Sequence, residues 1–420
     1  MPHDSRLAMT SAALSHIRIC DFSGQLAGAG ATRTLAAFGA QVIRIEDPVR
    51  RGRWDILRGV PPFVDDRKGI DMGGPFNNHN VEKLGITINL RTERGRELVA
   101  QLVAMSDVVT ENFAPGVLAR LGFPYDELRA LRDDIIYVSN SGFGHNGPYG
   151  SFKSWGPIAQ AVCGLTYTSG LPDLPPAGWG YSFMDHHGGN FMAVAILAAL
   201  LHRNRTGDGQ WIDMSAVEAG ITLDGPALLD FSVNGLPVLR DGMPDSNHSQ
   251  YPSMAPHNIY ASVGEDNWVA VACRDDTDWR ALAGVVGEPW CRDARFSVRS
   301  GRLEHEHELD GLIEAWTRRN DRFDIAKSLQ AVGVAAVAVA RPEDRIDNDP
   351  ATAAWGLWPV AHHREMGDVR VDGLPVHLSD TDWEITRGGP CLGEHNNLVF
   401  REIFRLSDDE IAKLRDDEVI

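Results

Sequence analysis

Short apolar runs alternate with amphipathic segments along the first half of the chain. The apolar runs are bounded by glycine and polar residues, which is typical of buried strands, and the amphipathic segments carry apolar residues at helical spacing. The predicted strands are Ile17–Asp21, Gln41–Glu46, Ile86–Leu90, Asp107–Glu111, Ile135–Ser139 and Gln210–Ser215. The predicted helices are Ala31–Phe38, Thr92–Met105, Val117–Leu121, Gly156–Ser169 and Phe191–Leu201. Strands that alternate with helices in this order predict βαβ units and a parallel sheet.

Glycine-rich or polar motifs follow several of these strands. Ser23–Gly30, Asn112–Gly116 and Asn140–Gly144 each come close behind a predicted strand. In open α/β sheets, ligands bind outside the carboxyl ends of the strands, so we expect a composite site there. The glycines of the first motif lack the G-x-G-x-x-G spacing, so the sequence does not predict NAD binding. A glycine-rich turn at a helix start can still approach a phosphate closely.

The composition changes in the second half of the chain. Val233–Ser253 is rich in Gly, Pro, Asp, Asn and Ser, which predicts a linker, and a second compact region begins near Met254. Its predicted elements are the hairpin strands Asn258–Ser262 and Trp268–Cys273, the helices Asp276–Val286, Glu304–Arg318 and Arg322–Val332, and the strand Val334–Ala340. Arg341–Gly389 looks irregular, a helix is predicted near Asn396–Phe404, and a capping box at Ser407–Glu410 opens the last helix.

These changes divide the sequence into domains. We predict a large domain at 1–225, a linker at 226–254 and a small α/β domain at 255–340. Residues 341–420 make up the last segment, an irregular stretch followed by C-terminal helices. A length of 420 residues agrees with more than one domain.

Charge and cysteine content narrow the classes of function. A net charge of −18 argues against non-specific nucleic-acid binding, which needs clustered Lys and Arg. The five cysteines lie far apart without a CxxC pair, so we expect no zinc site, no disulfide framework and a reducing compartment. Met1–His16 lacks a signal pattern, and the longest apolar stretch, Phe191–Leu201, is about half a membrane span. We expect a cytoplasmic protein with no membrane or nucleic-acid partner.

Asp185 is the one carboxylate in a stretch of glycines and aromatics, Gly178–Asn190, that precedes the apolar run at Phe191–Leu201. An aspartate at a helix start can be an N-cap, because its side chain accepts backbone N–H bonds and favours the helix dipole. It can also be a nucleophile or a general base. The local sequence leaves both interpretations open.

Motifs along nearly the whole chain, about Leu14–Ile420, occur in the order of a known family. They are Asp21-Phe22 with Gly28, Ile43–Glu46, Lys83–Ile86, Glu111–Gly116 with Arg120, Gly142–Gly144, Gly147-Pro148, Ile158–Gln160, Asp185 with Gly189, Arg205–Gly207, Gly209-Gln210, Ala255-Pro256 with Tyr260, Asp293–Phe296, Gly373–Pro375 and Leu392–His395. The ordered set resembles the class III CoA-transferases, the CaiB/BaiF family of formyl-CoA transferase-like enzymes. The resemblance implies an enzyme that moves CoA from an acyl-CoA donor to a carboxylic acid acceptor.

On this resemblance Asp185 falls on the family's catalytic aspartate and is the expected nucleophile. It attacks the thioester to give a mixed anhydride, the CoA thiolate returns to give an aspartyl-CoA thioester, and the acceptor acid takes the CoA. Coenzyme A or its acyl thioester is the expected substrate, and neither a metal nor NAD is expected. The residues carried over as CoA-binding are Leu26, Ala27, Lys83, Asn112, Phe113, Arg120 and Lys153.

The residues around Asp185 are candidates for the acyl pocket, namely Trp155, Trp179, Tyr181 and His186, with Phe183 and Met184 beside them. If they line the pocket, the acyl group is bulky, apolar or aromatic; the other interpretation places these aromatics in the core.

Three positions differ from the family pattern. Ala114 stands where a basic residue is common, and Gly156 stands where some members carry a glutamate. Asn247–Tyr251 occupies the region of the glycine-rich lid of formyl-CoA transferase. The first departure removes one cation, and the last leaves the lid mechanism open.

Two alternatives stay open. Racemases of the α-methylacyl-CoA type, in the same superfamily, pair an aspartate with a histidine to move a proton at the α-carbon. The matching position here is Trp155, although His145, His186 or His187 could act instead. A catalytically silent subunit of a hetero-oligomeric CoA-transferase is the second alternative, against which the presence of Asp185 argues.

The resemblance also implies the architecture and the assembly. The expected fold class is α/β, with a Rossmann-like large domain plus a smaller α/β domain in an interlocked homodimer. On the same resemblance, residues 341–420 are expected to form a return linker and C-terminal helices that rejoin the large domain. Val233–Ser253 and Arg341–Gly389 are long for loops of a compact domain, and threading around a partner chain accounts for them. A hetero-oligomer is the alternative assembly.

Overall fold

The computed structural model describes residues 12–170, 174–238 and 246–420. The first residues of the chain and part of the predicted linker, 239–245, therefore lie outside the described residues. The chain divides into two compact units. Unit 1 comprises Met1–Thr168, Ala177–Asn234 and Ala354–Ile420, and unit 2 comprises Ser169–Pro176 and Gly235–Ala353.

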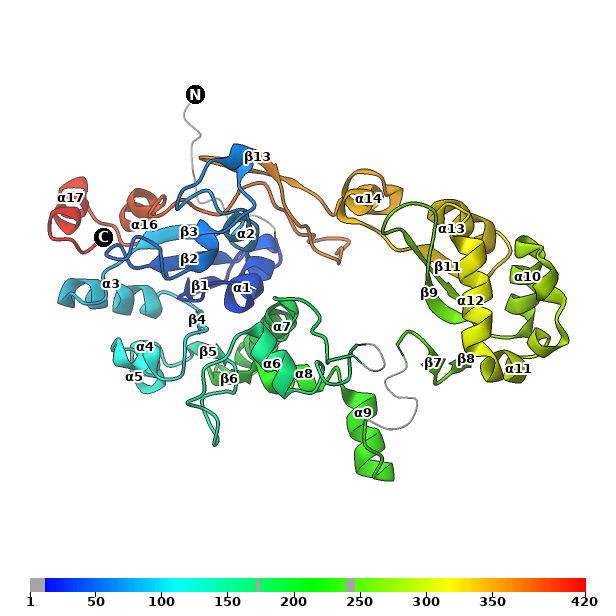
Figure 1. Ribbon diagram of the computed structural model, residues 1–420. Coiled ribbons are helices and arrows are strands. Elements are labelled where there is room, and N and C mark those ends of the chain that lie inside the picture. Colours follow the sequence, from blue (N-terminus) through cyan, green and yellow to red (C-terminus); the bar gives the residue numbers. More distant parts are fainter. Residues whose placement is uncertain (1–11, 171–173, 239–245) are drawn as a thin grey trace. The chain divides into compact units, whose positions relative to one another are not determined.

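Unit 1 is built on a six-stranded sheet whose strands are all parallel, in the order β3-β2-β1-β4-β5-β6 (Figure 1). The strands are β1 (Arg18–Asp21), β2 (Gln41–Glu46), β3 (Leu84–Thr87), β4 (Val108–Glu111), β5 (Ile136–Ser141) and β6 (Trp211–Ser215). This order confirms the predicted Rossmann-like α/β fold. Successive strands are added on one side of β1 up to β3 and on its other side from β4 onward. Open α/β sheets bind ligands at this switch point between β1 and β4.

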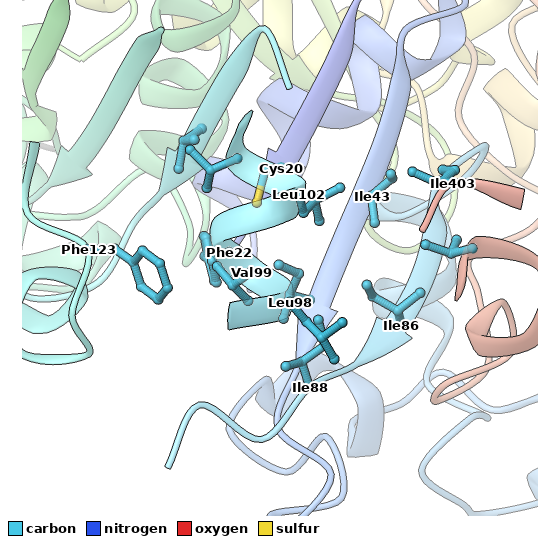
Figure 2. Close-up of a cluster of buried hydrophobic side chains, with 14 of the residues drawn as sticks. Cys20, Phe22, Ile43, Ile86, Ile88, Leu98, Val99, Leu102, Phe123 and Ile403 are labelled. Atoms are coloured by element: carbon cyan, nitrogen blue, oxygen red, sulfur yellow. The ribbon is translucent and has the colours of Figure 1, made fainter. Parts of the chain in front are cut away.

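Helices cover both faces of this sheet, because alternate residues of each strand point to opposite sides. On one face, Ile19 and Val42 pack with Leu35 of α1 (Ala27–Ala37) and Ile196 of α7 (Phe183–Thr206). On the other face, Cys20, Ile43 and Ile86 pack against Leu98, Val99 and Leu102 of α3 (Glu93–Ala104) and against Ile403 after α16 (Figure 2).

Further elements complete unit 1. They are η1 (Ile56–Gly59), η2 (Val64–Asp66), α2 (Gly74–His79), α4 (Val117–Arg120), α5 (Tyr125–Leu131), α6 (Gly156–Val162), α8 (Ala216–Ile221), α9 (Gly225–Leu229), η3 (Asp230–Asn234), α16 (Asn396–Glu402) and α17 (Asp408–Asp416). The predicted capping box is confirmed: Ser407 Oγ accepts from Glu410 N, and the Glu410 carboxylate accepts from Ser407 N. Val399, Phe400 and Leu414 place α16 and α17 on the core of the main sheet.

Two helices begin earlier than the sequence predicted. α7 starts at Phe183 and runs through the two glycines that we had placed before it, and α1 starts at Ala27 rather than Ala31. The glycines are tolerated because these helices pack closely: a Cβ at Gly189 would lie 2.7 Å from the carbonyl oxygen of Ala27. α7 also runs beyond the predicted end at Leu201, to Thr206, and its C-cap residue Gly207 has a left-handed conformation.

The prediction that Arg341–Gly389 is irregular is wrong in part. The segment holds α14 (Pro342–Asp347), α15 (Pro350–Trp355) and the strands β12 (Val360–His363) and β13 (Gly367–Arg370). α14 and α15 each begin with proline, which is favoured at the first helical position because its missing N–H has no helical partner. This signal was overlooked.

Unit 2 contains a three-stranded antiparallel sheet in the order β11-β10-β9. The hairpin predicted from the sequence is confirmed as β9 (His257–Ala261) and β10 (Trp268–Ala272), and β11 (Ala335–Ala338) joins its edge. Helices α10 (Asp276–Val286), α12 (Glu306–Thr317) and α13 (Arg322–Gln330) bury one face through residues such as Trp279, Leu309 and Leu329. The remaining elements are β7 (Ser249–Gln250), β8 (Ser253–Met254), η4 (Pro289–Arg292), η5 (Ala294–Phe296) and α11 (Arg299–Glu304).

Candidate active site

A cavity of about 350 Å³ opens in unit 1 where β1, β4 and β5 end. Its walls come from the loops that follow these strands, from η1, and from the first turns of α1, α6 and α7. Eight of the residues predicted for the site line it, namely Leu26, Ala27, Asn112, Phe113, Lys153, Trp155, Tyr181 and Asp185. The structure thus brings together side chains that lie up to 159 positions apart in the sequence.

Asp185 lies in the first turn of α7, whereas the N-cap of this helix is Ser182. The N-cap interpretation of Asp185 is therefore wrong, and its carboxylate is available to the cavity. Burial raises the pKa of Asp185 to about 6. A Cβ at Gly156 would collide with Asp185 Oδ2, so the carboxylate occupies space that only a glycine at 156 leaves free.

The loop after β1 is held from two sides. Asn112 donates from Nδ2 to the carbonyl of Gly24 at 2.9 Å and accepts from its N–H at 2.8 Å. Asp55 Oδ2 accepts from the N–H of Gln25 at 3.0 Å and pairs with the buried Arg44 at 2.6 Å. Both polar ends of the Asn112 amide are occupied in this way, so its observed role is to position the loop.

A second cavity of about 300 Å³ shares Trp54 and Phe113 with the first. The two shared rings lie 5.4 Å apart. The remaining lining is mostly apolar, from Phe22, Ile45, Ile88, Leu90, Val117 and Leu121, with Glu46, Asp47, Arg50, Asn89 and Arg91 as its polar members. Sequence analysis missed Arg50 and Arg91. The available signal for each was a cation a few residues beyond the carboxyl end of a predicted strand.

Lys83 and Arg120 line neither cavity. Lys83 is fully buried, and its ammonium donates to the carbonyl of Ala29 at 2.9 Å and to Asn80 Oδ1 at 3.0 Å, with Asp21 3.5 Å away. Burial lowers the pKa of Lys83 to about 8. Arg120 is exposed at the end of α4. The structure gives Lys83 a place inside the protein rather than on the wall of the site.

The aromatic residues near Asp185 divide into two groups. Trp155 and Tyr181 line the cavity together with Met184, and their rings lie 6.2 Å apart. Trp179 and Phe183 do not line it, and their rings contact each other at 4.9 Å. The expected aromatic wall is thus present in part.

None of the three histidines considered as a second base lines the cavity. The ring of His186 lies 5.3 Å from that of His79, and His187 Nε2 lies 3.0 Å from the carbonyl of Ala219. His145 Nε2 lies 3.4 Å from Glu111 Oε1, beside the ring of Trp211. Among the described residues of the cavity wall, Asp185 is the only carboxylate and Lys153 the only cation.

Among the described residues, no group of three or more His, Cys, Asp and Glu side chains is arranged to hold a metal ion. No helix in the described part of the chain is long and apolar enough to span a membrane. The remaining departure from the family pattern, Asn247–Tyr251, belongs to unit 2, and Ala114 lies on the cavity wall.

Comparison with known proteins extends over nearly the whole chain. A family model described as CoA-transferase family III matches residues 14–396. The succinyl-CoA–D-citramalate CoA-transferase of Chloroflexus aurantiacus is 32% identical over 410 residues, which cover 97% of this chain and 98% of that protein. The formyl-CoA:oxalate CoA-transferase of Streptomyces coelicolor is 30% identical over 421 residues, covering 98% and 100%. The crystal structure of a CaiB/BaiF family protein from Brucella suis is similar with a TM-score of 0.84 and 30% identity, covering 94% of this chain and 100% of that chain.

Proposed function

Since this chain belongs to CoA-transferase family III, we propose that it moves coenzyme A from an acyl-CoA donor to a carboxylic acid acceptor through covalent intermediates on Asp185. The observation that carries the proposal is the placement of Asp185. It is the only carboxylate among the described residues of a cavity at the point where the sheet order reverses. Gly156 leaves the carboxylate room on one side, and burial keeps it poorly solvated.

The proposed reaction needs no external energy source. The Asp185 carboxylate attacks the thioester carbonyl, the C–S bond breaks, and a mixed anhydride and CoA thiolate result. The thiolate then attacks the aspartyl carbonyl of the anhydride, which releases the first carboxylate and leaves an aspartyl-CoA thioester. The acceptor carboxylate attacks this thioester, its C–S bond breaks, and a second mixed anhydride and CoA thiolate result. The thiolate then attacks the acceptor carbonyl of this anhydride, which forms the new acyl-CoA and releases the Asp185 carboxylate.

Backbone amides at the start of α1 are proposed to stabilise the oxyanions of these steps. α1 begins at Ala27, and its N-cap residue, Leu26, has no side-chain cap bond. The first amides of a helix have no partner inside the helix, and the helix dipole favours negative charge beside them. Leu26 and Ala27 line the cavity with Asp185, so these donors suit a negative charge that develops there.

We propose that the nucleotide part of CoA occupies the second cavity. Its apolar wall suits an adenine ring, and Arg50 and Arg91 are cations that can pair with phosphate groups. Phe113 and Trp54 border both cavities, so a molecule can extend from the nucleotide to Asp185 past these rings. Lys153 on the wall of the first cavity supplies a further cation.

The proposed assembly is a homodimer, and its interlocked form stays a proposal. Support comes from α7, where Phe191, Val194, Leu197 and Leu201 form one apolar stripe whose side chains are between 41% and 64% exposed. Exposed apolar surface of this kind is typical of a protein interface. We also propose a cytoplasmic location, because all five cysteines are free thiols.

The proposal is tested by transfer assays without ATP. Purified enzyme is mixed with succinyl-, oxalyl-, butyryl- or benzoyl-CoA and a set of free acids, and formation of the new thioester is followed. We expect transfer with the wild type and none with Asp185→Asn. The benzoyl and succinyl donors separate a bulky acyl group from a short one. Deuterium exchange at the α-carbon without transfer would contradict the proposal and favour a racemase.

A further inference from the structure

Gln25 has a backbone conformation that side-chain-bearing residues rarely adopt. Its φ is +54°, in the left-handed region that favours glycine. The residue lines the same cavity as Asp185. Strained conformations outside glycine persist only where the surrounding structure enforces them, and they gather at functional sites. The question is what enforces this one and what it achieves.

A buried ion pair holds the backbone of Gln25. Asp55 is 1% exposed and accepts from the Gln25 N–H at 3.0 Å, and the same oxygen pairs with Arg44 at 2.6 Å. Arg44, fully buried, also donates to the carbonyl of Ser23 at 2.7 Å. Asn112 fixes Gly24 between them through two hydrogen bonds. Every residue from Ser23 to Gln25 is therefore held through its backbone.

The side chain of Gln25 takes no part in this support. Within the described part of the chain, its amide forms no hydrogen bond with another residue, and it is only half-buried. The fold thus maintains an unfavourable backbone conformation and leaves the polar end of the side chain unused. The amide is therefore free of partners within the described residues and available to a ligand in the cavity that Gln25 and Asp185 both line.

The loop that carries Gln25 lies beside the nucleophile. Ala27 begins α1, and its carbonyl oxygen lies 2.7 Å from the place of a Cβ at Gly189. Gly189 comes one helical turn after Asp185 on the same face of α7. This contact joins the first turns of α7 to the start of α1, and Asp185 and Gln25 line the same cavity beside it.

We propose that the side-chain amide of Gln25 binds substrate by donating a hydrogen bond to an anionic oxygen of the acyl group next to Asp185. This inference rests on the proposed function and adds a substrate-binding residue to it. A cation in this place would pair with the Asp185 carboxylate, whereas a neutral amide can bind the substrate oxygen and leave the nucleophile free. The oxygen has two sources: the reacting acyl carbonyl as it becomes an oxyanion, or a second carboxylate of the acyl group.

Gln25→Gly is the decisive variant, because glycine adopts a φ of +54° without strain. We expect this variant to keep or raise the Tm of the wild type, and to lower the rate of acyl transfer by about 10²-fold, as for loss of one oxyanion donor. Gln25→Asn keeps an amide and tolerates the left-handed region, so it should recover part of the loss. The matched control is Asp66→Gly, at an exposed residue with φ +55° that lines neither cavity.

Succinyl-CoA and butyryl-CoA distinguish the two sources, because they have equal chain length and differ in the second carboxylate. A similar loss of kcat with both donors would identify the reacting acyl oxygen as the atom that Gln25 binds. A rise of KM restricted to succinyl-CoA would identify the second carboxylate of the acyl group as the group that Gln25 binds. Wild-type kcat and KM in Gln25→Gly with both donors would overturn the inference. Failure of the wild type to transfer CoA from any thioester of the panel would instead overturn the proposed function, and this inference with it.

Discussion

The state of the Asp185 carboxylate decides whether the proposed first step can occur, because only the ionised form is a nucleophile. Burial disfavours the charged form and raises its pKa to about 6. A poorly solvated carboxylate is also more reactive once it is ionised, since less water has to be removed before attack. The same burial costs stability, because the folded protein must keep a charge where it is poorly solvated.

The pH dependence of the enzyme follows from this pKa. We expect kcat/KM to rise tenfold for each pH unit below about 6 and to level off above it, as Asp185 loses its proton. The measurement is initial transfer rate between pH 4.5 and 8.5. A plateau that extends down to pH 4.5 would contradict this, since it would mean an aspartate with an ordinary pKa.

The raised pKa of Asp185 also affects stability: rising pH increases activity but lowers the free energy of unfolding. The folded pKa is raised from 3.8 to about 6, so the folded state binds the proton more tightly than the unfolded state, and stability is lost as pH rises through this range. Removing the charge with Asp185→Asn should stabilise the protein by about 3 kcal/mol at pH 8 and by little at pH 4. Urea unfolding at both pH values measures the difference. Equal stability of variant and wild type at pH 8 would contradict the account.

Single residues were predicted with uneven success, for identifiable reasons. The position of Asp185 on the cavity wall was predictable because its motif and the apolar run after it are contiguous in the sequence. Lys83 was assigned to CoA because a lysine in a motif reads as a surface cation, whereas tertiary packing buries its ammonium against Asp21 and Asn80. Gln25 carries no signal at all, because a left-handed φ results from contacts with Asp55, 30 positions away.

At the level of elements, the two ends of β3 carry cations with different roles: one is part of the protein interior, and the other is a candidate ligand-binding residue. Lys83 lies at the start of β3, inside the protein, and Arg91 lies beyond its other end, on the wall of the second cavity. The two residues therefore give opposite expectations for stability and for CoA affinity.

We expect Lys83→Met to lower the free energy of unfolding by about 3 kcal/mol, because it leaves the Asp21 carboxylate buried without its cation. Its KM for acyl-CoA should stay near the wild-type value. Arg91→Ala should do the reverse, with unchanged stability and a KM raised about tenfold, as for loss of one charged hydrogen bond. Urea unfolding and steady-state kinetics on both variants test this. A raised KM in a stable Lys83→Met protein would restore the direct CoA contact predicted from the sequence.

Element boundaries were less predictable than element types. The strands of the large sheet could be predicted as strands because central parallel strands are rich in apolar residues. The start of α7 could not be predicted, because Gly188 and Gly189 suggest a helix break until the packing of Gly189 against α1 is known. Helices α14 and α15 were overlooked because each is only six residues long, and an initial proline is the one local signal of its start.

At the scale of the whole molecule, the parallel sheet determines where the site lies. The sheet order predicts a crevice between the loops after β1 and β4, and the cavity with Asp185 lies there. The sequence predicted the parallel strands and the composite site at their ends. It did not predict which loops would meet, because strand order is fixed by long-range packing and not by local pattern. The C-terminal helices illustrate the same limit: their return to the sheet was inferred from family resemblance.

The apolar stripe of α7 makes the proposed homodimer testable. We expect sedimentation velocity to give twice the chain mass at micromolar concentration, and Val194→Glu to shift the protein toward monomer or to prevent its assembly, because the change places a charge in the stripe. Val376→Glu, at an exposed valine outside α7, is the matched control and should remain dimeric. A stable wild-type monomer would contradict the proposed assembly.

The most direct test of the central claim is intact-protein mass spectrometry after brief mixing with each acyl-CoA, followed by hydroxylamine. The account predicts a hydroxamate mass shift that peptide mapping assigns to Asp185, and its absence in Asp185→Asn. Covalent transfer through Asp185 would be contradicted if the wild-type protein stayed unmodified while the acyl-CoA substrate incorporated deuterium at its α-carbon in D2O.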